Sequence, residues 1–379
     1  MSNLATVTTP QESSSALDLT TPLPVAAYFD EALYQQEIKQ LFNPGPRYIG
    51  HALMVPAAGD YHVLESSQGA RYLKRTDDGV KLFSNICRHR QATMLEGRGN
   101  ATHTVCPLHR WTYDQHGQLL GAPHFSEKPC LHLPETELQS WNGMLFESGR
   151  DIERDLKNLG VREDLDFSQY VFHSVTIDEY QGNWKTFIEV YLEDYHVVPF
   201  HPGLGRFVDC NQLKWEFGDW YSVQTVGVHH DLARPGSKVY QDWHRQVKRY
   251  SQDKTPKYGA IWLTYYPNIT VEWYPHTLVI STIIPTGPRS YKNVVEFYYP
   301  EDVAYFEPEL IAAEQAAYAE TAVEDVEIIN RMEAGRQALH AQGRNEVGPY
   351  QSPMEDGMRH FHQFLRRELA GYIPAHDTK

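Results

Sequence analysis

The sequence predicts an α+β protein in which a small all-β unit precedes a larger domain that combines an antiparallel sheet with a long helix. Short strand-like runs separated by turns fill residues 49–146, and aromatic-rich strand-like runs fill residues 215–284. Residues 308–342 are rich in Ala and Glu and repeat their apolar positions at helical spacing. Strands and helices that are segregated along the chain in this way are typical of α+β proteins.

Each element of the all-β unit has a local signal. Asp78-Gly79 and His116-Gly117 have the composition of hairpin turns, and residues 141–146 are predicted to form the closing strand. The other predicted strands are short runs rich in apolar residues, and they cover residues 61–64, 70–73 and 80–84.

The second region is predicted to open with a helical stretch near residues 189–197. Residues 274–277 form a predicted turn between two strands, and residues 308–342 are predicted to form one helix or two. The predicted strands cover residues 215–228, 259–264, 269–273 and 278–284.

Composition narrows the function classes. The chain has 379 residues, which suits about two domains, and a net charge of -15 that disfavours nucleic-acid binding. It has no apolar run of the roughly 18 residues that a membrane span needs. Residues 1–25 contain no Lys or Arg, so we expect a flexible leader and not a secretory signal or transit peptide. Four cysteines are too few for a disulfide framework, which fits a cytoplasmic protein.

Two short blocks carry the strongest functional signal. Cys87 and His89 belong to the first block, and Cys106 and His109 belong to the second. Two cysteines and two histidines can complete a [2Fe–2S] cluster in which histidines replace cysteines on one iron, and they can also form a structural zinc site. A zinc finger pairs its cysteines in one block and its histidines in the other. Here each block has one of each, which favours the cluster, an electron-transfer centre.

His196 and His201 are a second candidate metal pair. They lie five residues apart and so cannot share a face of one continuous helix. Pro199 is expected to end the helix and to push Val198 out of the helical region, so that the chain returns His201 toward His196. Glu193 lies three residues before His196 and on its face. Taken alone, such a histidine pair is more often structural than metal-binding.

A non-haem Fe(II) centre that activates O₂ uses two histidines and one carboxylate and leaves other positions open. The predicted C-terminal helix offers several carboxylates, and spacing does not choose among them. They are Glu320, Glu324, Asp325 and Glu327.

Together these motifs resemble the large (α) subunit of the Rieske non-haem iron oxygenases, over nearly the whole chain beyond the leader. Trp111 follows the second Cys/His block as it usually does in that family. Residues 183–185, Asn-Trp-Lys, precede the two-histidine motif as they do in many members.

The resemblance implies a domain organisation and two sets of ligands. It implies an all-β Rieske [2Fe–2S] domain at residues 45–155 and a helix-grip catalytic domain at residues 156–379, with residues 26–44 as an N-terminal helical part of the catalytic domain. The family's third iron ligand is an Asp that often follows an acidic residue, as Asp325 does here. The implied ligands are Cys87, His89, Cys106 and His109 for the cluster and His196, His201 and Asp325 for the mononuclear Fe(II).

The resemblance also implies an electron path. The family places an acidic residue, here Glu193, three positions before the first iron-binding histidine, where it bridges to a Rieske histidine of the neighbouring subunit. We therefore expect a homotrimer closed head to tail. Electrons would come from NAD(P)H through a separate reductase, with or without a ferredoxin. Arg110 stands where the family commonly has glycine.

The implied activity is O₂-dependent hydroxylation, dihydroxylation or demethylation of a small organic substrate. We expect an aromatic or carboxylate-bearing compound, as in aromatic hydrocarbon catabolism, with Lys214, Arg206 or Arg234 as candidates to hold a carboxylate. A quaternary ammonium compound held by cation–π contacts is the alternative. The candidate aromatic wall consists of Trp215, Phe217, Trp220, Trp262, Tyr265, Tyr266, Trp273 and Tyr274.

Two classes without oxygenase activity remain open on the residues alone. One is a Rieske electron carrier, which would need little beyond residue 150, and the other is a helix-grip ligand-binding module without metals. About three irons per chain would indicate the oxygenase, two the electron carrier, and none the binding module.

Overall fold

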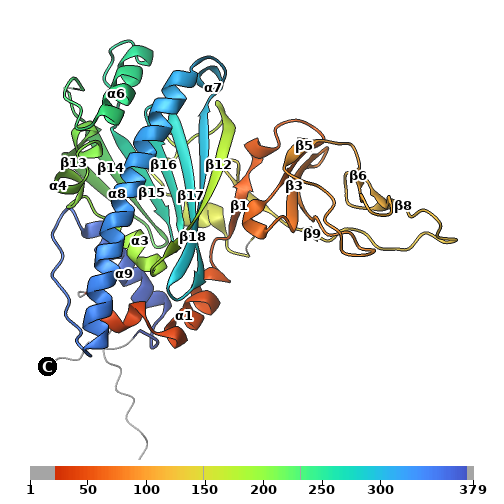
Figure 1. The fold of residues 1–379 in the computed structure, drawn as a ribbon, viewed down its shortest axis with the longest axis horizontal. Helices are drawn as coiled ribbons and strands as arrows, with labels where there is room; N and C mark the ends of the chain where they lie inside the picture. The colour runs from red at the N-terminus through yellow and green to blue at the C-terminus, as the bar shows by residue number, and fades with distance from the viewer. Residues whose placement is uncertain (1–21, 148, 231, 374–379) are drawn as a thin grey trace, which may run out of the picture.

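The computed structural model describes residues 22–147, 149–230 and 232–373. They form a large part that contains a seven-stranded antiparallel sheet crossed by a long helix, and a small β part that projects from one side (Figure 1). The predicted α+β fold class is therefore confirmed.

The seven strands of the large sheet run in the order β12-β18-β17-β16-β15-β14-β13, and neighbouring strands are antiparallel. Their bounds are β12 Tyr170–Gln181, β13 Val208–Phe217, β14 Tyr221–Val228, β15 Ala260–Tyr265, β16 Ile269–Tyr274, β17 Thr277–Gly287 and β18 Ser290–Pro300. β15, β16 and β17 match predicted strands, the strand predicted over residues 215–228 covers β14 and the end of β13, and β12 and β18 were not predicted.

The strand predicted over residues 215–228 is wrong, because the chain turns there. The backbone N–H of Gly218 donates to the carbonyl of Tyr221 at 2.9 Å, which closes the hairpin between β13 and β14. A Cβ atom on Gly218 would lie 2.2 Å from the Tyr221 ring, so the turn requires glycine. Residues 141–146 are likewise two strands, joined by Asn142 and Gly143 with φ values of 47° and 84°, a turn that suits an Asn-Gly pair.

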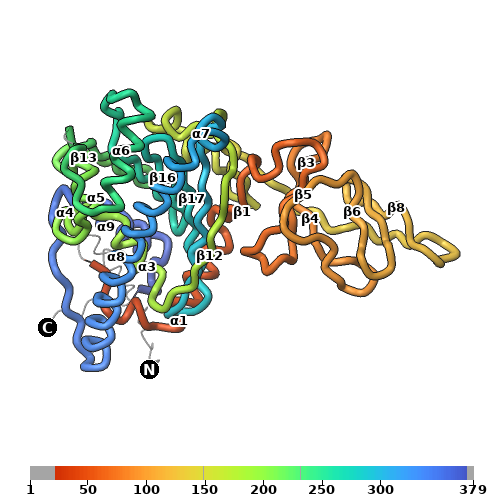
Figure 2. The backbone as a smooth tube through the Cα atoms, turned by 45° about the horizontal axis from the view of Figure 1, so that its top comes forward, coloured from red at the N-terminus to blue at the C-terminus, as the bar shows by residue number. Residues whose placement is uncertain are grey.

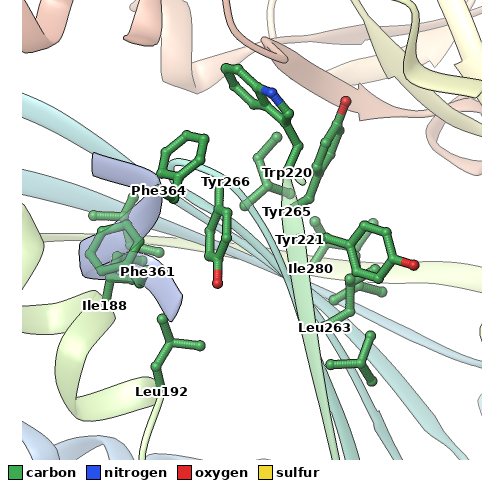
Figure 3. Close-up of a cluster of buried hydrophobic side chains, with 14 of the residues drawn as sticks. Ile188, Leu192, Trp220, Tyr221, Leu263, Tyr265, Tyr266, Ile280, Phe361 and Phe364 are labelled. Carbon is green, nitrogen blue, oxygen red and sulfur yellow. The ribbon is translucent and has the colours of Figure 1, made fainter. Parts of the chain in front are cut away.

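Helices cover both faces of the large sheet. The predicted stretch at residues 308–342 is one helix, α8, and it crosses one face together with α6 (Figure 1). On the opposite face, Phe361 and Phe364 of α9 and Ile188 of α3 pack in one cluster with Leu263 and Ile280 of the sheet (Figure 3). The α-helices are α1 Glu31–Glu37, α2 Ile152–Asp155, α3 Trp184–Tyr191, α4 Val197–Phe200, α5 Leu204–Phe207, α6 Lys238–Tyr250, α7 Glu301–Phe306, α8 Pro308–Ala341 and α9 Asp356–Glu368.

The N-terminal segment belongs to the large part. Residues 1–21 of the predicted leader lie outside the described residues, but Leu23 and Val25 are 2% and 4% exposed, so the predicted leader does not reach residue 25. Short helices η1 (Val25–Tyr28) and η2 (Ile38–Phe42) flank α1. No helix in the described ranges has both the length and the apolar character needed to cross a bilayer.

The small part contains short strands in three sheets, ordered β1-β11-β10, β5-β2-β3-β4-β9 and β6-β7-β8. Their bounds are β1 Tyr48–His51, β2 Asp60–Val63, β3 Arg71–Thr76, β4 Gly79–Ser84, β5 Arg98–Asn100, β6 Thr104–Val105, β7 Thr112–Tyr113, β8 Leu119–Gly121, β9 Glu135–Thr136, β10 Gln139–Trp141 and β11 Met144–Phe146. The strands predicted over residues 61–64, 70–73 and 80–84 correspond to β2, β3 and β4, and a turn joins two strands at both predicted turn positions.

A buried ion pair fixes α3 against α8. The carboxylate of Glu189 on α3 is fully buried and lies 2.5 Å from Nη2 of Arg336 on α8. The hydroxyl of Tyr28 and Nε2 of His362 also donate to this carboxylate. Burial raises the pKa of Glu189, but Arg336 and the hydrogen bonds from His362 and Tyr28 outweigh it and leave the pKa at about 2. The pair therefore stays charged and ties four segments together.

We predict that Glu189→Gln lowers the free energy of unfolding by about 3–5 kcal/mol, because it leaves Arg336 buried without its charged partner. Because the folded-state pKa of Glu189 is depressed, its contribution is present above the ordinary pKa of about 4.3. It is lost as the pH falls through about 2. Denaturant unfolding of the holoprotein measures both effects.

Glu179→Gln is the matched control, because Glu179 forms an exposed ion pair with Lys292. We expect a loss of less than about 1 kcal/mol for this control. Equal stability of the two variants would contradict the central role of the Glu189–Arg336 pair.

Candidate active site

His196, His201 and Asp325 converge on one point. Nε2 of His196 lies 3.0 Å from Nε2 of His201, and Oδ1 of Asp325 lies 3.6 Å and 3.1 Å from these two atoms. One ligand atom from each residue lies within 4.8 Å of the other two, so a single ion can contact all three. This is the donor set of the two-histidine, one-carboxylate iron sites.

The two histidines stand at opposite ends of a short helix. His196 precedes α4 and His201 follows it. The C-terminal boundary of the helix predicted over residues 189–197 is wrong. α3 stops at Tyr191, and the chain turns before His196. Pro199 does not break a helix here. It is the third residue of α4, in the first turn, where its missing N–H has no partner to lose.

A carboxylate lies within hydrogen-bonding distance of Nδ1 of each histidine. Oε1 of Glu193 lies 2.5 Å from Nδ1 of His196, and Oε2 of Glu324 lies 2.7 Å from Nδ1 of His201. These contacts keep a proton on each Nδ1 and leave both Nε2 atoms with a free lone pair that faces Asp325.

The three facing atoms then fit a cation. Oδ1 of Asp325 is buried and accepts no hydrogen bond from the described residues, although both Nε2 atoms are close to it. Three lone pairs that point at one another are unfavourable unless a positive ion lies between them. Of the four carboxylates that the sequence left open, Asp325 is the one in this position. Glu324 contacts the far side of His201, and Glu327 pairs with Arg331 on the surface.

The four residues of the Cys/His blocks also come together. Cys87 and Cys106 are 2% and 1% exposed, and burial and then the neighbouring Cys87 raise the pKa of the Cys106 thiol. His89 is half-buried and His109 is exposed, and their Nδ1 atoms lie 3.2 Å apart. Two buried thiols beside two less buried imidazoles match the donors of a [2Fe–2S] cluster with cysteines on one iron and histidines on the other.

The two blocks form loops of the same shape. The backbone N–H of Gln91 donates to the carbonyl of Cys87 at 3.1 Å, and that of Arg110 donates to the carbonyl of Cys106 at 3.1 Å. Gln91 and Arg110 both have positive φ values, 57° and 61°. This left-handed conformation explains why glycine suits the position of Arg110, and it costs a residue with a side chain roughly 1 kcal/mol.

The two candidate metal sites lie in different parts of the structure (Figure 1). The loops with His89 and His109 adjoin β5, β6 and β7 in the outer half of the small part (Figures 1 and 2). The pair His196 and His201 adjoins α4 and α8 in the large part.

A cavity of about 540 Å³ contains the convergent histidine–aspartate site. Its floor includes Gln224, Trp262 and Glu272, which are paired side by side on β14, β15 and β16. Its roof is α8, where Glu314 and Tyr318 stand on the same helical face as Asp325.

Only part of the predicted cavity wall is present. Trp262 and Tyr274 line the cavity, whereas Trp220, Tyr265 and Tyr266 pack in the core on the other side of the sheet (Figure 3). The rings that the sequence did not indicate are Tyr180, Phe187, Tyr191, Tyr240, Trp243, Phe297 and Tyr318.

The charge of the cavity differs from the expectation. Lys214, Arg206 and Arg234 do not line it, and no lysine or arginine is among the described residues that do. Its acidic residues are Asp178, Glu193, Asp194, Glu272, Glu314 and Asp325. The structure therefore gives no support to a carboxylate-bearing substrate.

Family comparisons cover most of the chain. The model "Ring hydroxylating alpha subunit (catalytic domain)" matches residues 165–371, and the model "Rieske [2Fe-2S] domain" matches residues 47–141. Members of these families bind a mononuclear iron and a [2Fe–2S] cluster.

Curated relatives match over nearly the full length. The chain is 61% identical to putrescine 2-hydroxylase of Ralstonia nicotianae, over 94% of this chain and 98% of that protein. It is 52% identical to putrescine 2-hydroxylase of Bordetella bronchiseptica, over 92% and 85%. Choline monooxygenase of Spinacia oleracea is 25% identical, over 93% and 79%.

Solved structures share the fold. The quaternary ammonium Rieske monooxygenase CntA in complex with L-carnitine aligns with a TM-score of 0.71 at 16% identity, over 93% of this chain and 97% of that chain. Naphthalene 1,2-dioxygenase from Rhodococcus sp. aligns with a TM-score of 0.68 at 18% identity, over 93% and 95%.

We predict that Asp325→Ala lowers the iron content by about one atom per chain and leaves acid-labile sulfide unchanged, because it removes one of three convergent donors and leaves the Cys/His loops intact. Elemental analysis of the purified protein measures both. Glu327→Ala, an exposed change on the same helix, should retain all the iron. Full iron content in Asp325→Ala would exclude Asp325 as a ligand.

Proposed function

The chain belongs to the Rieske non-haem iron oxygenases, which incorporate oxygen from O₂, and we propose that it hydroxylates a primary aliphatic diamine such as putrescine at carbon 2. The observation that carries this proposal is the acidic cavity. A substrate with two ammonium groups needs negative charge around it, and the described cavity wall supplies carboxylates and no competing lysine or arginine. Relatives at 61% and 52% identity are named putrescine 2-hydroxylases.

A quaternary ammonium substrate fits this cavity less well. Rings such as Trp262 and Tyr274 offer cation–π contacts to either kind of cation. Glu272 and Glu314, however, are hydrogen-bond acceptors, and only an ammonium that carries N–H groups can donate to them. The primary amine is therefore the better partner.

In the proposed enzyme, Cys87, His89, Cys106 and His109 hold the [2Fe–2S] cluster, and His196, His201 and Asp325 hold the mononuclear iron. The bound iron supplies O₂ activation. Glu193 and Glu324 orient the two imidazoles, and the aromatic walls exclude water and hold the substrate chain. In the net reaction a C–H bond is replaced by C–OH. One oxygen atom of O₂ enters the product, and the other becomes water with two electrons and two protons.

In the proposed enzyme, electrons would come from NAD(P)H through a separate reductase, with or without a ferredoxin, and the cluster would supply one-electron transfer. Because the two candidate sites lie in different parts of the chain, we propose a homotrimer in which Glu193 of one subunit faces His89 or His109 of its neighbour. The position of Glu193 supports this role. Its carboxylate contacts His196 and is still 13% exposed, so a neighbouring subunit can reach it. We place the enzyme in the cytoplasm.

We predict that the purified enzyme, supplied with NADH and a reductase, couples O₂ consumption to formation of 2-hydroxyputrescine from putrescine. Choline, carnitine and benzoate serve as controls and should give at least about tenfold lower kcat/KM. A higher kcat/KM for any of these controls would contradict the proposed substrate class.

We also predict that Glu193→Ala retains both metals but slows turnover at least about 100-fold, because the connection between subunits is lost. The readout is reoxidation of the pre-reduced cluster on exposure to O₂ and substrate. Glu324→Gln is the matched control, because Glu324 holds His201 as Glu193 holds His196. Equal reoxidation rates in the two variants would show that Glu193 only orients a histidine.

A further inference from the structure

We propose that Glu272 and Glu314 together receive one ammonium group of the substrate. This inference rests on the proposed diamine hydroxylation and names the residues that select for it. Both carboxylates line the cavity that contains His196, His201 and Asp325. Their exposed fractions are only 3% and 1%, so neither charge is solvated by bulk water.

The two carboxylates reach the cavity from opposite walls. Glu272 lies on β16 in the floor, and Glu314 lies on α8 in the roof. Tyr318, one turn after Glu314, donates its hydroxyl to Oε1 of Glu272 at 3.3 Å, so the floor and the roof meet at this point. Asp325 lies seven residues beyond Tyr318, roughly 10 Å along the helix axis. The carboxylate pair and the iron site are therefore two separate places in one cavity. This separation suits a substrate in which a short aliphatic chain joins the ammonium group to the carbon that is hydroxylated.

The hydrogen-bond donors around the pair are all neutral. The indole N–H of Trp262 donates to the Tyr274 hydroxyl at 2.8 Å, so that hydroxyl donates its own proton to Oε2 of Glu272 at 2.8 Å. Tyr299 donates to Oε2 of Glu314 at 2.6 Å. These bonds hold both carboxylates in place without neutralising them.

A positive charge is missing from this arrangement. Within the described ranges, neither Glu272 nor Glu314 forms an ion pair with a basic side chain, and burying a carboxylate without a counter-charge is unfavourable. Burial raises the pKa of Glu272 to about 7 and that of Glu314 to about 8, and Glu272 adds to the second shift. A primary ammonium removes this cost, since it brings one positive charge and three N–H donors.

The test is the affinity of the iron-loaded, anaerobic enzyme for putrescine, measured by calorimetry. Glu272→Gln keeps the shape of the side chain and removes the charge, and we expect the dissociation constant to rise at least about 30-fold. Glu314→Gln should raise it at least about threefold. Asp178→Asn is the matched control, because Asp178 is an exposed carboxylate at the same cavity, and it should change the constant by less than about threefold.

An unchanged dissociation constant in Glu272→Gln, or equal weakening in Asp178→Asn, would overturn the assignment. If the Gln variants do not fold, the wild-type enzyme supplies the test. Wild-type enzyme should bind n-butylamine at least about 30-fold more tightly than 1-butanol, and equal affinities would overturn the assignment. Wild-type enzyme that binds putrescine without hydroxylating it would refute the proposed function and leave the ammonium site standing.

Discussion

The candidate iron site depends on how α3 is held against α8. The turn after α3 leads to His196, and α8 carries Asp325, so a slip of one helix along the other would separate donors that now lie within 3.6 Å. The Glu189–Arg336 ion pair opposes such a slip, because its two charges are buried and would lose their partners. Stability of the large part and geometry of the site are thus properties of the same interface.

The long helix α8 serves three purposes along one face. It presents Asp325 to the histidines, Tyr318 to the floor of the cavity and Glu314 to the cavity as part of its roof. In our account, α8 therefore sets the spacing between the ammonium site and the metal. The small β part carries the other candidate metal site in its outer half (Figure 1). In our account a single chain holds both ends of an electron path, and the path is completed only between neighbouring subunits.

Local patterns predicted much of this from sequence. The Cys/His blocks, the two histidines and the helical stretch at residues 308–342 all have short-range signals. The structure brings each set of ligand candidates together and forms the helical stretch as one helix, where the sequence left one or two open. The choice of Asp325 needed the family resemblance, since four carboxylates on one helix look alike until the fold shows which one faces the histidines. The cavity was least predictable, because alternate residues of each strand face opposite sides. Tyr240 and Trp243 had a usable signal, the helical spacing after the Ser237 cap on α6.

The most direct test of this account is complementation between subunits. Co-expressed chains of two kinds, one with Cys87→Ser and no cluster and one with Asp325→Ala and no mononuclear iron, are purified as mixed oligomers with two different tags. Each variant alone is inactive. The account predicts that the mixed oligomers hydroxylate putrescine, because the cluster of one subunit supplies the iron site of its neighbour. Mixed oligomers with full metal content at the intact sites but no activity would contradict it.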